Sequence, residues 1–259
     1  TWVRWATRVP ATSRVGFGET EDYEFFVDED GLDLEHELLV FGMRPERAYH
    51  LQVLSETEDG EQLFSDDLVY ETGALPFPTL QTEVTCHQSK YIYPGWTLAN
   101  LSLGEDIDQV AVVMFDDEGE VVWYYTFPGE DARADIEATL VDNGNVLMGG
   151  AVASNLRPVE VDMTGTIQWA GPEQTDSELA IGGMHHTFKK LPNGNYVTMF
   201  FDFHAGLVDV IEEFTPDLTE VWTWNTFDYL PDPETPYPQG NDVQVDLDDD
   251  AVYYNAHVE

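Results

Sequence analysis

The chain has 259 residues, of which 42% are hydrophobic and 13% aromatic, enough to build one large β domain or two smaller domains. Its 51 acidic residues face 10 basic ones, so the net charge is −41 and the chain repels DNA, RNA and anionic lipid. No apolar run reaches the roughly eighteen residues of a membrane span. We therefore expect no nucleic-acid partner and no membrane span.

The acidic surplus has two competing explanations. One is solubility in concentrated salt, where a Debye length of about 3 Å at 1 M screens self-repulsion. The other is a set of divalent-cation sites, with calcium as the ion. The acids are spread along the chain rather than gathered in one loop pattern, which favours a halophilic protein. We expect no cofactor and keep calcium as the alternative, in carboxylate-rich turns such as 116–119 and 246–250.

Residues 1–76 predict short strands. Residues 2–7 show the two-residue period of a sheet, and Pro45 precedes Tyr49 at the head of another alternating strand. This spacing resembles the tyrosine corner of fibronectin type III domains. We therefore expect an Ig/fibronectin III-like β-sandwich with His36 and His50 at its surface, and with residues missing before Thr1.

Residues 77–95 contain Pro78, Pro94 and Gly95 and predict a linker. Cys86 is the only cysteine of the chain, so no internal disulfide can form.

A repeat begins at Trp96. A turn glycine followed four residues later by tryptophan occurs at Gly119 and Trp123 and again at Gly165 and Trp169, with a looser copy ending at Trp222. An Asn-Gly-Asn turn interleaves with it, at 143–145 and 193–195. Two hairpins recurring in each unit give about four strands per repeat, the size of a β-propeller blade.

Residues 96–259 would supply three to four blades, whereas a propeller usually needs about four to eight to close. We therefore expect the ring to be incomplete at Glu259. Each blade buries its face only against its neighbours, so further chain or another copy would have to complete the fold.

The stretch 182–200 concentrates chemistry-bearing residues. His185 and His186 lie on a predicted strand, Lys189 and Lys190 follow, and Asn193-Gly194 predicts a tight turn into a returning strand. Successive strand residues point to opposite faces, so only one histidine of the pair can face a central funnel.

This His-His hairpin, with its Leu-Pro-Asn-Gly-Asn turn, resembles the arylsulfate sulfotransferase family. The resemblance implies a small N-terminal sandwich and a propeller with a histidine-lined funnel. It also implies a secreted, cell-surface or periplasmic enzyme. Such an enzyme passes a sulfuryl group from a phenolic sulfate ester to a phenol through a sulfohistidine, without a nucleotide sulfate donor.

The resemblance assigns catalytic roles to His186, His185 and His257, with His186 favoured as the funnel residue. Gln239, Asn241 and Lys189 are then candidate substrate-binding residues. Gln239 stands where the family has a second histidine, and Ala256 stands where it has an arginine. The family's nucleophilic histidine is expected beyond Glu259.

Three other interpretations remain open. The chain could be an inactive extracellular propeller that serves as a binding or assembly module, which the Gln239 and Ala256 replacements favour. It could be a subunit of a homo-oligomer or extracellular polymer. The histidines His185, His186, His204 and His257 could gather a metal ion, although no ligand spacing on one element supports this.

Overall fold

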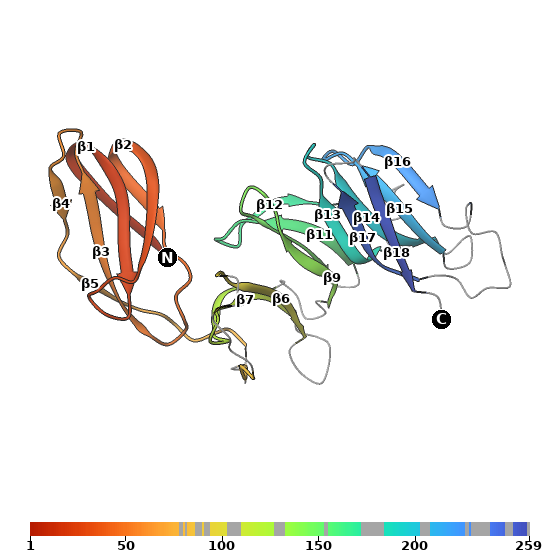
Figure 1. Ribbon diagram of the computed structural model, residues 1–259, viewed down its shortest axis with the longest axis horizontal. Coiled ribbons are helices and arrows are strands. Elements are labelled where there is room, and N and C mark those ends of the chain that lie inside the picture. Colours follow the sequence, from red (N-terminus) through yellow and green to blue (C-terminus); the bar gives the residue numbers. More distant parts are fainter. Residues whose placement is uncertain are drawn as a thin grey trace. The chain divides into compact units, whose positions relative to one another are not determined.

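The computed structural model describes residues 1–77, 80, 82–85, 90, 94–102, 110–126, 133–152, 155–171, 184–202, 208–225, 228, 239–246 and 251–257. The regular elements in these ranges are eighteen β-strands, which confirms the predicted all-β class (Figure 1). No helix in the described ranges is long and apolar enough to cross a membrane. The chain divides into two compact units: residues 1–96 with 114–123, and residues 97–113 with 124–259.

The first unit is built on one five-stranded sheet of order β2-β1-β3-β4, with β5 also paired to β3. Its strands are β1 (Trp2–Gly18), β2 (Phe25–Leu39), β3 (Ala48–Glu56), β4 (Gln62–Phe64) and β5 (Leu68–Glu71).

Strands β1 and β2 form a long antiparallel ribbon whose register shifts between Ala6 and Ser13. Side chains from both ends of this ribbon reach one core, where Val15 and Leu38 pack with Tyr49 and Leu51 of β3.

Tyr49 is the second residue of β3 and is 3% exposed. Its hydroxyl accepts a hydrogen bond of 2.9 Å from the backbone N–H of Arg44, five residues upstream. A buried tyrosine that bonds back to preceding backbone is the contact expected of a tyrosine corner. The motif read from Pro45 and Tyr49 therefore has the hydrogen bond that it predicts.

The predicted surface position is wrong for His36, which is 4% exposed. Its ring stacks on Trp5 with centroids 4.8 Å apart, and its two nitrogens lie 2.9 Å from Ser13 Oγ and 3.0 Å from Thr7 Oγ1. His36 shares the inward face of β2 with Leu38, two residues on. Burial is tolerated because hydroxyl groups satisfy both ring nitrogens.

The second part of the chain repeats a simple pattern of antiparallel neighbours. Strands β9 to β12 form one meander and β13 to β16 another, and both belong to one eight-stranded sheet (Figure 1). A three-stranded sheet precedes them and a two-stranded sheet follows. The strands are β6 (Thr97–Ser102), β7 (Val110–Phe115), β8 (Val121–Thr126), β9 (Arg133–Leu140), β10 (Val146–Val152), β11 (Asn155–Val161), β12 (Ile167–Ala170), β13 (Met184–Lys190), β14 (Tyr196–Asp202), β15 (Val208–Phe214), β16 (Glu220–Asn225), β17 (Gln239–Asp246) and β18 (Ala251–His257).

Five hairpins from β7 onwards share one turn. In each, the first residue's N–H bonds the fifth residue's carbonyl, and the fourth residue's N–H bonds the first residue's carbonyl. The fourth residue has positive φ, as in a type I turn closed by a G1 bulge. Asn193 has no positive φ, so the Asn-Gly sequence makes a three-residue loop in which only the glycine is left-handed. The five turns are 116–120, 141–145, 162–166, 191–195 and 215–219.

The two meanders meet through their first strands. Strand β13 runs parallel to β9, with His186 opposite Ile136. Strand β6 lies against β9, where Asn100 Oδ1 accepts a 3.0 Å hydrogen bond from the Ala138 N–H. Strand β17 is in turn in contact with β13. First strands of successive repeats are thus neighbours, and the described strands do not close a ring.

The core of this region lies between repeats. Leu147 of β10 packs with Phe188, Tyr196 and Phe214 of the next meander, and Trp169 of β12 stacks on Tyr196 at 4.2 Å. Each repeat therefore covers the apolar face of its neighbour, as expected of a repeat protein.

Candidate functional site

Strand β13 carries the predicted histidine pair near its beginning. The backbone at His186 pairs with Ile136 of β9, so His186 lies at the junction of two repeats. The register of β13 against β14 shifts between Met184 and Phe188, which places His185 and His186 in an irregular stretch of the strand. The side chains of both histidines lie outside what the structure describes.

Gln239 and His257 face each other across one hairpin. Gln239 begins β17, His257 ends β18, and the two residues are register partners. Asn241 lies at the register shift between Gly240 and Asp242. This pairing joins two sequence-predicted site residues at the backbone level, while their side chains, and the whole of His204, lie outside the described part of the chain.

Lys189 lies at the other end of β13 from the histidines. It pairs with Val197 next to the hairpin turn. At about 3.3 Å per residue, three residues separate Lys189 from His186 by roughly 10 Å along the strand. The structure therefore places the predicted anion-binding lysine well away from the histidine backbone.

Lys189 and Lys190 instead line a cavity between two Asn-Gly-Asn hairpins. The cavity has a volume of about 560 Å³ and has both polar and apolar walls. It is lined by Thr139, Leu140, Val141, Asp142, Asn143, Lys189, Lys190, Leu191, Pro192 and Gly194.

Glu160, beside this cavity, is a buried carboxylate that the sequence analysis missed. It is 2% exposed and is the second-last residue of β11. Its oxygens accept hydrogen bonds from Lys190 Nζ at 2.7 Å and Tyr196 OH at 3.1 Å, and from Asn143 and Asn145 Nδ2 at 2.9 and 2.7 Å. All four donors surround one acid, so Glu160 stays ionised inside the protein.

The electrostatics follow from this geometry. Burial alone raises the pKa of Glu160, but the Lys190 and asparagine hydrogen bonds, with the charge of Lys190, lower it to about 2. Burial first, and then the Glu160 carboxylate, raise the pKa of Tyr196. Lys190 also lies 5.6 Å from the Tyr196 ring centroid. The Lys190 charge is thus largely neutralised by Glu160, which leaves it a weak attractor for an anion.

Glu213 repeats the arrangement one meander later. Its Oε1 accepts hydrogen bonds from Asn195 at 2.6 Å and Asn193 at 3.3 Å, and its other oxygen accepts from Trp222 Nε1. Both acids are the second-last residue of a strand that returns beside an Asn-Gly-Asn turn. An acid followed by one apolar residue at the end of the second strand after each such turn was the available sequence signal.

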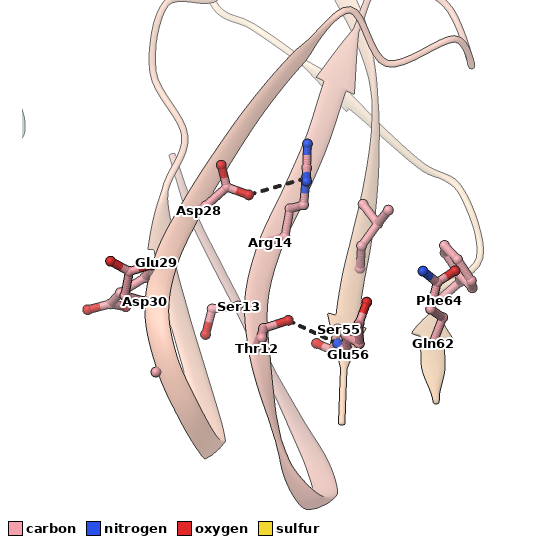
Figure 2. A pocket seen from close by; sticks show the side chains of 12 residues that line it. Thr12, Ser13, Arg14, Asp28, Glu29, Asp30, Ser55, Glu56, Gln62 and Phe64 are labelled. Atoms are coloured by element: carbon pink, nitrogen blue, oxygen red, sulfur yellow. Dashed lines mark hydrogen bonds and ion pairs between the residues drawn. The ribbon is translucent and has the colours of Figure 1, made fainter. Parts of the chain in front are cut away.

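A second cavity, of about 470 Å³, lies in the first unit and has an acidic wall (Figure 2). Asp28, Glu29, Asp30 and Glu56 line it, and its only lining cation, Arg14, pairs with Asp28 at 3.2 Å. Such a wall repels a sulfate ester, so this cavity does not suit the predicted substrate.

The acidic turn at 116–119, a candidate calcium loop, uses its carboxylates locally. Asp116 Oδ1 accepts the N–H groups of Glu118 and Glu120, and Asp116 Oδ2 pairs with Arg44 at 2.7 Å. Calcium binding here stays a prediction, and residues 247–250 of the second acidic run lie outside the described residues.

The protein is all-β and is built from four-stranded meanders. The first strands of two meanders, β9 and β13, pair in parallel, and β13 carries the histidine pair. A family model for arylsulfotransferase (ASST) matches residues 81–256, well over half of the chain. The chain therefore belongs to the arylsulfotransferase family, which confirms the resemblance seen in the sequence. No curated protein matches the chain.

Proposed function

We propose that this protein transfers a sulfuryl group from an aryl sulfate ester to a phenol through a histidine intermediate. The family match over residues 81–256 supports the class of reaction. The location of the proposed active site rests on one observation, the parallel pairing of β13 with β9 at His186 and Ile136. It brings the first strands of two repeats together, as a funnel lined by several repeats requires.

The proposed chemistry needs a neutral imidazole. Its free nitrogen attacks sulfur, an N–S bond forms, and the S–O bond to the aryl group breaks with both electrons leaving on the phenolate. The phenolate takes up a proton. A second phenol then gives up its proton and attacks the same sulfur, the N–S bond breaks, and the imidazole is released unchanged. Imidazole suits both steps because its ordinary pKa lies near neutrality.

His186 is the β13 histidine that we place in the funnel, because only one of two successive strand residues can face it. In this proposal it stabilises negative charge on the sulfuryl oxygens, and the attacking imidazole is another histidine of the funnel. In this proposal Gln239 and Asn241 bind sulfuryl oxygens through their amide N–H groups. His257, the register partner of Gln239, stabilises charge on the leaving phenolate. An amide donates hydrogen bonds but carries no charge and moves no proton, so Gln239 can bind but cannot act as an acid or base.

Lys189 has a more distant role in this proposal. Roughly 10 Å of strand separates it from His186, so it does not share one small sulfuryl group with that residue. Its charge instead offsets part of the acidic field near the cavity between the two hairpins. Changing Lys189 to Gln should therefore raise KM for the aryl sulfate and leave kcat nearly unchanged.

The second candidate is an inactive extracellular module for binding or assembly. The specific observation in its favour is the pair of replacements, Gln239 for histidine and Ala256 for arginine, which removes two charge-stabilising groups of the family pattern. Under this reading the histidine strand is kept for its place between the repeats.

The test mixes the protein with 4-nitrophenyl sulfate, with and without a phenol acceptor, in concentrated salt. The proposal predicts that 4-nitrophenolate is released only when the acceptor is present. It also predicts that the rate of this release falls about a hundred-fold in His186→Asn. His185→Asn measured beside it shows which histidine of the pair reaches the substrate. The inactive binding or assembly module would be the better description if neither the wild-type protein nor the double variant Gln239→His/Ala256→Arg shows turnover.

A further inference from the structure

Three side chains with metal-binding atoms converge in the first unit, and none of them is a predicted catalytic residue. Glu21 lies in the turn between β1 and β2, His50 lies on β3, and Asp67 directly precedes β5. One ligand atom from each lies within 4.8 Å of the other two. Among the described residues of a chain with 51 acids, this is the group of three that meets that geometry. It is therefore more specific than the acidic surface at large.

Asp67 is held in place by His50 of β3 and by Tyr23, which lies in the loop between β1 and β2. His50 Nδ1 lies 2.8 Å from Asp67 Oδ2, and the Tyr23 hydroxyl donates a 3.0 Å hydrogen bond to Asp67 Oδ1. These two contacts fix the orientation of the Asp67 carboxylate. A ligand carboxylate oriented by a hydrogen-bond donor behind it is the usual arrangement in metal sites.

His50 and Asp67 are half-buried, with side chains 26% and 27% exposed. Glu21 is exposed and lies on a turn, so its side chain can move. A tetrahedral ion with ligand bonds of about 2.0–2.2 Å needs its ligand atoms roughly 3.3–3.5 Å apart. The His50–Asp67 pair is already close enough, and a rotation of Glu21 supplies the third contact.

We propose that Glu21, His50 and Asp67 bind a divalent transition-metal ion, with zinc as the best fit. One imidazole nitrogen with two carboxylate oxygens is a ligand set for zinc or a neighbouring first-row ion. Calcium and magnesium prefer oxygen ligands throughout. The ion takes the lone pair of His50 Nδ1, and the ring keeps its proton on Nε2. Three protein ligands leave one position for water.

Binding exchanges the present hydrogen bond for two metal bonds. The His50–Asp67 contact breaks, Asp67 keeps its bond from Tyr23, and the net charge of the three side chains is offset by the ion. The net charge of −41 raises the local concentration of any divalent cation, most strongly at low salt. Metal binding should therefore weaken as the salt concentration rises. The part of the affinity that comes from direct coordination by the three side chains should remain at high salt.

The test uses the whole protein, stripped of metal with a chelator and dialysed. Cobalt(II) is the spectroscopic probe and zinc the competitor, in about 1 M NaCl so that diffuse attraction is screened. The expected result is visible ligand-field absorption that zinc abolishes. Asp67→Asn should weaken the zinc affinity of this site, measured by calorimetry, at least about ten-fold.

Asp66→Asn is the matched control, because it removes the same charge from the neighbouring exposed residue. Far-UV circular dichroism and the Tm without metal confirm that each variant is folded. Equal zinc binding by wild-type, Asp67→Asn and His50→Gln proteins would overturn the site, as would equal losses in Asp66→Asn and Asp67→Asn. This outcome is independent of sulfuryl transfer, because the function proposed above assigns no role to these three residues.

Discussion

Lys190 Nζ lies 2.7 Å from the buried Oε2 of Glu160, and this ion pair joins two consecutive repeats. Glu160 belongs to the β9–β12 meander and Lys190 ends the first strand of the next one. The same carboxylate also accepts hydrogen bonds from the hairpin asparagines of its own repeat. One acid therefore fixes a turn within a repeat and the spacing between repeats.

Replacing Glu160 with Gln should destabilise the protein by about 3 kcal/mol at pH 7, since the pKa falls from 4.5 unfolded to about 2 folded. A depressed carboxyl pKa gives stability that is complete above pH 4.5 and disappears as pH falls towards 2. At pH 3 the difference between the two proteins should therefore shrink by about 2 kcal/mol. Urea unfolding at both pH values measures this.

Asp142→Asn is the control for Glu160, because Asp142 is an exposed acid on the same hairpin. Its free energy of unfolding should stay within about 0.5 kcal/mol of wild-type. A Glu160→Gln effect that does not change between pH 7 and pH 3 would contradict the assignment of an ionised, buried Glu160.

Glu212 should show the opposite pH dependence. It is 3% exposed on β15, and its Oε1 has no hydrogen-bond partner. Burial, with the nearby charge of Glu220, raises its pKa to about 7. The folded protein thus holds a proton that the unfolded chain releases above 4.5, so stability is lost as pH rises from 4.5 to 7. Glu212→Gln should therefore stabilise the protein by about 3 kcal/mol at pH 8 and hardly at all at pH 4.

Thermal unfolding of Glu212→Gln and wild-type at these two pH values measures the effect, with the exposed Glu220→Gln as the comparison. Removing Glu220 takes away only the smaller cause of the raised pKa. It should therefore give a smaller stabilisation at pH 8. A Glu212→Gln protein less stable than wild-type at pH 8 would show that Glu212 is charged and paired.

Tyr49→Phe tests the corner of the first unit. The change leaves the Arg44 N–H without its 2.9 Å acceptor, at a cost of about 1–2 kcal/mol. Tyr70→Phe, on the exposed β5, removes the same atom and should cost less than about 0.5 kcal/mol. Equal losses of unfolding free energy in Tyr49→Phe and Tyr70→Phe, measured with denaturant, would show that the tyrosine corner does not stabilise this fold.

The G1-bulge turns predict matched glycine effects. Gly144 and Gly194 have φ of 82° and 86°, and an added Cβ would meet nothing within 4 Å at either position. Alanine should therefore cost only the left-handed backbone strain, about 1–2 kcal/mol at each site. Calorimetric Tm values of the two single variants should fall by similar amounts, and an unchanged Tm at either would exclude the positive φ there.

Salt should stabilise the protein. With a net charge of −41, raising NaCl from about 0.1 M to 2 M screens self-repulsion and should raise the Tm. Potassium chloride should act equally if screening is the cause. A further rise on adding calcium at constant ionic strength would favour the calcium explanation of the acidic surplus, and a Tm independent of salt would contradict the halophilic interpretation.

The positions of the hairpins could be predicted from local sequence, because the residues that define each turn lie within five positions of one another. The Asn-Gly-Asn turns, the turn glycines before Trp123 and Trp169, and the repeat of strands follow directly from it. Leu218 is the exception: it occupies the left-handed position at φ 66° where the other four turns have glycine. Its packing on the Phe214 cluster offsets a backbone conformation that local preference disfavours.

The sequence by itself determined the all-β class, the hairpin positions and the arylsulfotransferase family, because periodicity and turn residues are written in neighbouring positions. Only the tertiary structure decided that Glu160 meets Lys190, that His36 is buried, and that Glu21, His50 and Asp67 converge. Each of these depends on strands distant in sequence. Their register is set by the burial of apolar faces from several segments at once, which no single segment specifies.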